Sequence, residues 1–182
     1  MSPYSWFKAA VLTLLACNAA VFAEYGTANE ALDSMAWFVL LLLFEVETGF
    51  GARVRHPRAG IAIRAIRLVA AFAIAIAAIG YVRDREWLEA INAWLWIGVV
   101  ALLELEVRQP RAVAAHRTAF AYTAAALYGG LAVAMLAWAV KGEWFDAYDA
   151  LLWLVAFATI ELNVLRAAAR SGERAAEVGN KA

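Results

Sequence analysis

Three short segments of the sequence place acidic residues at the end of an apolar run. They read FEVET at residues 44–48, LELEV at residues 103–107 and IELNV at residues 160–164. An ionisable side chain inside a transmembrane segment is costly, and it usually faces a bundle interior, a partner charge or a water-filled path. The first acid of each segment is therefore our candidate ion or proton site: Glu45, Glu104 and Glu161.

Only one acid of each segment can line a shared pathway. At about 100° per residue in a helix, Glu45 and Glu47 point about 160° apart. In the third segment Asn163 stands where the other two segments have their second acid. The first acid is thus the one that all three segments share.

Two interpretations of these glutamates stay open. In the first, the three carboxylates converge on a central axis, where their mutual repulsion favours binding a cation or carrying protons. In the second, each glutamate forms an ion pair with a basic residue at the start of another helix. The candidate ion-pair partners are Lys8, Arg67 and Arg117, of which Lys8 and Arg67 precede Glu45 and Glu104 by 37 residues each.

Transmembrane helices are the elements that must position these residues. The chain has 182 residues, of which 65% are hydrophobic, and a mean hydropathy of +0.65. A membrane-spanning helix needs about 20 mainly apolar residues. Six apolar runs approach this length once their flanks are included, so we expect six spans: residues 7–23, 32–44, 66–82, 91–103, 118–140 and 151–165. Because the second, fourth and sixth runs are short, re-entrant segments are the alternative there.

A longer pattern comes into register when the three acids are aligned. It reads [ED]-A-x-[DN]-x3-W-x7-E-[VL]-[EN] and recurs at spacings of 59 and 57 residues. Recurrence at such a period indicates internal structural repeats. We therefore predict an all-α membrane protein with a single transmembrane domain, formed by three tandem helical hairpins in a pseudo-threefold bundle. The hairpins cover about residues 7–48, 64–107 and 118–165, and residues 166–182 form a cytoplasmic tail.

The remaining repeated positions are assigned structural roles. Acids at the start of a helix interact favourably with its dipole, and Thr27 with Glu30 spells a capping box, so we predict no site there. The tryptophans are predicted to pack inside the bundle, each with an Asp or Asn one turn before it that holds the indole N–H. These residues are Trp37, Trp96 and Trp153, preceded by Asp33, Asn92 and Asp149.

The distribution of charge indicates how the chain lies in its membrane. Residues 24–33, 83–89 and 141–149 hold nine acids and three bases, whereas residues 53–67, 108–117 and the tail hold twelve bases and two acids. Basic loops stay in the cytoplasm, so both termini are predicted to be cytoplasmic in a bacterial-type inner membrane. Lipid is the expected partner, together with further copies or other membrane subunits; we expect no nucleic acid.

Two functions remain open. No phosphate-binding loop, Ser/His/Asp set or HExxH motif occurs in the sequence, so we expect neither an enzyme nor a cofactor; whether a metal binds is open. The first hypothesis is a small channel or transporter for cations or protons that uses the three glutamates. The alternative is a non-catalytic scaffold or accessory subunit of a larger membrane complex.

Overall fold

The computed structural model of the protein describes residues 3–50 and 57–159. Within these ranges the structure is helical and contains no strand. Its labelled helices are α1 (Pro3–Tyr25), α2 (Ala28–Phe50), α3 (Pro57–Asp84), α4 (Trp87–Arg108), α5 (Pro110–Ala115) and α6 (Arg117–Lys141). A further helix covers residues 144–159. The helical prediction is confirmed, while the predicted tail and Glu161 lie outside the described residues.

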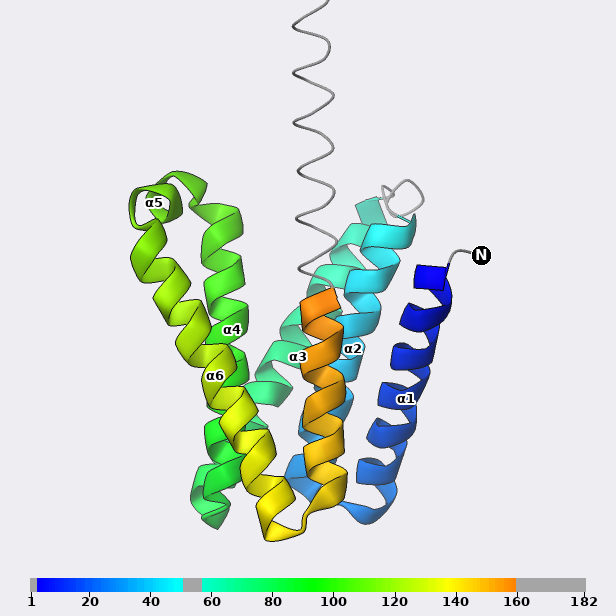
Figure 1. The fold of residues 1–182 in the computed structure, drawn as a ribbon. Coiled ribbons are helices and arrows are strands. Elements are labelled where there is room, and N and C mark those ends of the chain that lie inside the picture. Colours follow the sequence, from blue (N-terminus) through cyan, green and yellow to red (C-terminus); the bar gives the residue numbers. More distant parts are fainter. Residues whose placement is uncertain (1–2, 51–56, 160–182) are drawn as a thin grey trace, which may run out of the picture.

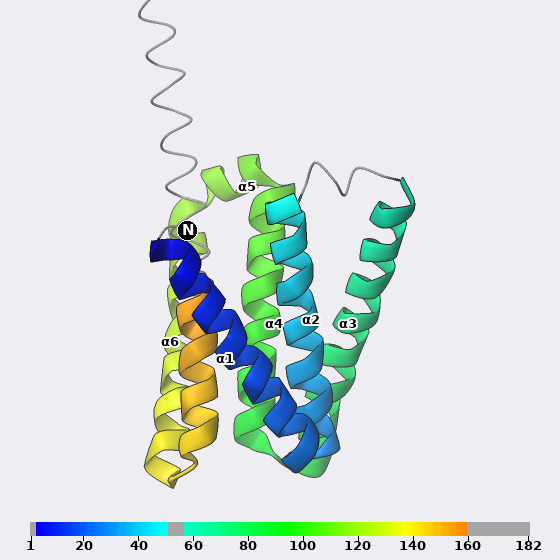
Figure 2. The same ribbon diagram turned by 90° about the vertical axis from the view of Figure 1, so that its right-hand side faces the viewer.

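The long helices run antiparallel to their neighbours along the chain (Figures 1 and 2). The turns at residues 26–27, 85–86 and 142–143 lie together at one end of the bundle, which is the lower end in Figure 1 and is called the turn end below. The N-terminus and the short helix α5 lie at the other end, called the α5 end. Helix α5 occupies a stretch that we expected to be a loop, and it begins at Pro110, a residue suited to the first helical position.

Four helices are long and apolar enough to cross a membrane: α1, α3, α4 and α6. Helix α2 has a similar length but carries four acids, and the helix at 144–159 has 16 described residues. Exposed apolar side chains on α3, such as Val69, Phe72 and Ile76, fit contact with a lipid bilayer. The structure therefore confirms a helical membrane protein, whereas the count of six spans stays a prediction.

Local sequence explains how two of the turns at the turn end form. The amide N–H of Thr27 donates to Glu30 Oε2 at 2.6 Å, and the amide N–H of Glu30 donates to Thr27 Oγ1 at 3.3 Å. This reciprocal pair is the predicted capping box at the start of α2. Gly142 ends α6 with a φ of 86°, a left-handed conformation that glycine adopts without strain.

Small residues allow the helices to approach closely. Ala77 and Ala78 of α3 pack against Ala90 and Ala93 of α4, and all four side chains are buried. The main core lies between the two ends of the bundle and contains the three repeated tryptophans together with Leu15 and Leu131. Burial of the tryptophans confirms their predicted position inside the bundle.

Candidate functional site

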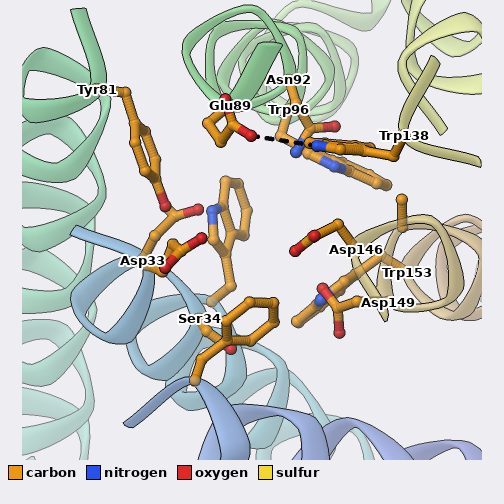
Figure 3. Close-up of a pocket in the computed structure, with 14 residues that line it drawn as sticks. Asp33, Ser34, Tyr81, Glu89, Asn92, Trp96, Trp138, Asp146, Asp149 and Trp153 are labelled. Atoms are coloured by element: carbon orange, nitrogen blue, oxygen red, sulfur yellow. Dashed lines mark hydrogen bonds between the residues drawn. The ribbon is translucent and has the colours of Figure 1, made fainter. Parts of the chain in front are cut away.

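A cavity at the turn end collects the polar and aromatic residues of the sequence pattern (Figure 3). Each of three helices contributes an acid, then an Asp or Asn three residues later, then a Trp four residues after that. Positions i, i+3 and i+7 lie on one face of a helix, so each helix presents all three side chains in the same direction. The contributing residues are Glu30, Asp33 and Trp37 of α2, Glu89, Asn92 and Trp96 of α4, and Asp146, Asp149 and Trp153 of helix 144–159.

The cavity is layered from its rim to its floor. The acids at the first position of each set are partly exposed, as are the Asp and Asn residues one turn deeper. The tryptophans form the floor and are each less than 10% exposed. The ring centroid of Trp37 lies 6.3 Å from that of Trp96 and 6.4 Å from that of Trp153, so the indole of Trp37 neighbours both of the others across the bundle.

Hydrogen bonds fix most of the polar groups around the cavity. Asp33 interacts with Trp37 and Asp149 interacts with Trp153, each one turn later on its own helix, as the spacing of four residues predicted. Asn18 on α1, which is buried, donates through Nδ2 to Asp149 Oδ1 at 2.8 Å. These bonds hold both carboxylates in position against the tryptophan floor.

Helix α6 adds a fourth tryptophan to the wall. The indole nitrogen of Trp138 donates to Glu89 Oε1 at 3.2 Å, an interaction drawn in Figure 3. Tyr81 of α3 completes the wall on the opposite side and is buried. Glu89 is thus bound to another helix, so its role exceeds the capping that the sequence suggested.

Two polar atoms in the cavity have no hydrogen-bond partner in the described structure. They are Asp33 Oδ1 and Asn92 Oδ1, both shielded from solvent. Buried acceptors in folded proteins are nearly always paired with a donor from protein, water or ligand. The cavity that both residues line has a volume of about 70 Å³, which is enough for a small molecule.

The electrostatic character of the site is strongly negative. Five of the 14 residues that line the cavity carry a carboxyl group, and no lining residue is basic. Just outside it, burial and the nearby carboxylates of Glu30, Glu89 and Asp84 raise the pKa of Glu86, which lies in the turn between α3 and α4. The turn end therefore has a surplus of negative charge that its own side chains do not balance.

Two of the glutamates singled out from the sequence, Glu45 and Glu104, lie at the α5 end. Glu45 forms an ion pair with Lys8 of α1, and the Glu45 side chain is 16% exposed. Both residues line a second, smaller cavity of about 30 Å³, which lies between α1, α2 and helix 144–159. The structure therefore brings Lys8 and Glu45 together, as the ion-pair interpretation expected.

Arg67 and Glu104 have different partners from the pair that the sequence suggested. Arg67 pairs with Glu47 of α2, because α3 packs along α2 and Glu47 faces it. Glu104 pairs with Arg108 one turn later in its own helix, where both side chains are more than half exposed. Arg117 begins α6, and its candidate partner Glu161 lies outside the described residues.

Sequence reasoning found the repeated residues of the cavity but assigned the site to the other end of the bundle. The signal was present in the spacing of three and then four residues, which recurs on three helices. Asn18, Tyr81 and Trp138 belong to helices without a repeated motif, and no sequence signal identified them. A comparison with protein-family models, curated proteins and solved structures finds no match to this chain.

Proposed function

We propose that the protein is a small cation transporter of a bacterial-type inner membrane, and that the cavity at the turn end is its binding site. In this proposal all six long helices span the membrane as three hairpins related by ancestry and by an approximate threefold axis. The turn end faces the outside, and both termini face the cytoplasm. Glu45, Glu104 and Glu161 then lie near the cytoplasmic side instead of forming the primary site.

The negative charge of the cavity carries the proposal. Five carboxyl groups line the cavity without a basic residue among them. Carboxylates that share a small and partly dry space repel one another, so binding a cation or protons is favourable there. Ionisable residues at membrane depth also mark ion or substrate pathways in general.

The two cavities and the core between them support a transporter over an open channel. Trp37 lines the turn-end cavity, and Leu41, one turn later on α2, lines the small cavity at the α5 end. Both side chains are less than 10% exposed, so packed apolar residues separate the two cavities. A cation bound at the turn end would thus cross only after the helices rearrange, as alternating access requires.

The scaffold alternative explains less of the structure. Exposed apolar helix faces fit either lipid or a partner subunit, so they do not distinguish the two functions. A scaffold has no need of five carboxyl groups around a tryptophan floor. Purification of the chain in a fixed ratio with other membrane proteins, without cation flux after reconstitution, would favour the scaffold.

Flux measurements in proteoliposomes test the proposal. We expect the reconstituted protein to carry a cation or protons, and Asp33→Asn and Asp149→Asn to lower the flux by about tenfold or more, equivalent to about 1.4 kcal/mol. Glu104→Gln is the matched control, because Glu104 is an exposed carboxylate at the α5 end. Equal flux from all three variants and the unchanged protein would reject the cavity as the site.

A further inference from the structure

We propose that the cation bound in the turn-end cavity is a short primary alkylammonium ion, with its N–H groups donated to Asp33 and Asn92 and its carbon atoms against the tryptophan floor. This inference rests on the proposed function and specifies the substrate class of the same site. Three features carry it: the two acceptors without partners, the aromatic floor and the size of the cavity.

The polar atoms of the cavity call for a ligand with more than one donor. Asp33 Oδ1 and Asn92 Oδ1 come from α2 and α4 and are shielded from solvent without a hydrogen-bond partner. A primary ammonium group carries three N–H donors, as the lysine side chain does, so it has one donor for each oxygen and a third besides. The carboxylate of Asp33 adds charge to one of these bonds, which strengthens it.

The aromatic floor favours an organic cation over an inorganic one. Four tryptophans line the cavity, and indole is the aromatic ring that attracts cations most strongly through its face. A metal ion instead needs several oxygen ligands held close together. Within residues 3–50 and 57–159, no three Asp, Glu, His or Cys side chains are arranged to hold a metal ion.

The volume limits the length of the carbon chain. The cavity measures about 70 Å³. A protein cavity of about 150 Å³ accommodates benzene, which has six heavy atoms. Scaling by volume leaves room for about two to four heavy atoms, which corresponds to methylammonium, ethylammonium or a propylammonium ion.

Equilibrium binding of radiolabelled methylammonium to the protein in lipid nanodiscs tests this inference. We expect saturable binding that ethylammonium displaces and that sodium, potassium and calcium ions at equal ionic strength do not. Tetramethylammonium should compete poorly, because it has no N–H donor for the two oxygens. The same preparation is then assayed for flux of each cation in proteoliposomes.

Two matched pairs of variants locate the bound ion. Asn92→Ala removes one acceptor and should weaken methylammonium binding about tenfold, whereas Asn92→Asp keeps an acceptor and should retain binding. Asn29→Ala is the control, because this amide lies at the same end but donates to Asp84 outside the cavity. Trp96→Leu should weaken binding about fivefold, while Trp94→Leu, at a half-exposed tryptophan of the same helix, should leave it unchanged.

The outcomes separate this inference from the proposed function. Suppose that alkali or alkaline-earth ions bind or cross in a way that depends on Asp33, and that methylammonium does not change this binding or flux. That result would overturn the inference and leave cation transport intact. Proton flux alone would do the same, with water molecules as the donors to the two oxygens. If no cation binds and none crosses, both the inference and the proposed function fail.

Discussion

At the scale of single residues, the same type of side chain has different surroundings at the two ends of the bundle. Glu89 and Asp149 in the turn-end cavity accept hydrogen bonds from tryptophan and asparagine side chains, whereas Glu45 and Glu47 at the α5 end form ion pairs with lysine and arginine. A carboxylate that is already paired with a base is neutralised within the protein. Among the described residues, the acids that line the turn-end cavity have no ion pair with a base, so they remain available to attract a cation.

We predict that neutralising Glu45 destabilises the protein more than neutralising Glu104. Glu45 is 16% exposed and pairs with Lys8, which is 35% exposed, so Glu45→Gln leaves a partly buried ammonium without its partner. The cost should be about 1 to 2 kcal/mol, between the values typical of exposed and buried ion pairs. Glu104→Gln should cost about 0.5 kcal/mol or less, because its pair with Arg108 is exposed. Thermal or chemical denaturation in detergent measures both changes.

A double-mutant cycle decides whether the Lys8–Glu45 contact is responsible for the larger loss. Lys8→Met keeps the apolar stem of lysine and removes its charge. If the pair contributes stability, the effects of Lys8→Met and Glu45→Gln are non-additive by about 0.5 kcal/mol or more. Additive effects would mean that Glu45 acts through other contacts.

At the scale of helices, glycines set the distance between α4 and α6. A Cβ atom at Gly98 of α4 would lie 2.9 Å from Leu127 Cδ2, and one at Gly130 of α6 would lie 3.0 Å from Leu95 Cδ1. A leucine of the opposite helix thus packs against each glycine. This reciprocal packing holds α6 where Trp138 reaches Glu89 at the wall of the cavity.

We predict that Gly130→Val separates α4 from α6, while Gly129→Val is tolerated. Overpacking at Gly130 should cost about 1 to 3 kcal/mol of folding stability. No described side chain lies within 4 Å of a Cβ atom at Gly129, so the adjacent substitution should stay within about 0.5 kcal/mol of the unchanged protein. Denaturation in nanodiscs compares the two variants. Equal losses at both positions would show that glycine is needed for backbone reasons and not for packing against Leu95.

Helix identity and the turns were predictable from local sequence, but the pairing of helices was not. Apolar length, the Thr27–Glu30 capping box and glycine after α6 act over a few residues and are visible in the sequence. The separation of 37 residues placed Arg67 and Glu104 at similar depth, yet depth does not specify which helix lies beside which. Arg67 meets Glu47 because α3 packs along α2, a fact of tertiary structure.

The site was predictable in part for a similar reason. Internal repetition identified Asp33, Asn92 and the tryptophans, because equivalent positions in equivalent helices face the same way. Asn18 and Trp138 complete the cavity from helices without a repeated motif. Their contribution depends on the rotation of α1 and α6 about their own axes, which the weak periodicity of these all-round apolar helices does not determine.

At the scale of the whole molecule, charge separates the two ends. The residues around the three turns hold nine acids and three bases. The described basic segments, residues 57–67 at the start of α3 and residues 108–117 around α5, lie at the opposite end of the bundle (Figure 1). Bases flanking a span favour the cytoplasmic side. If the turn end faces the outside of the cell, the acid-lined cavity faces the cations there.

We predict that the three turns lie on the same, outer side of the membrane, which follows if all six long helices span it. In a Cys17→Ser background, single cysteines at Tyr25, Trp87 and Trp144, each more than half exposed beside one of the turns, should react with a membrane-impermeant maleimide in intact cells. A cysteine at Arg111 in α5, also exposed, should react only after permeabilisation and serves as the control for the opposite end. Labelling at Arg111 with protection at the turns would invert the orientation and direct the cavity toward the cytoplasm. Every complete span reverses the side on which the next turn lies. A difference between Tyr25 and Trp87 would therefore mean that α2 or α3 does not span the membrane, and a difference between Trp87 and Trp144 would mean that α4 or α6 does not.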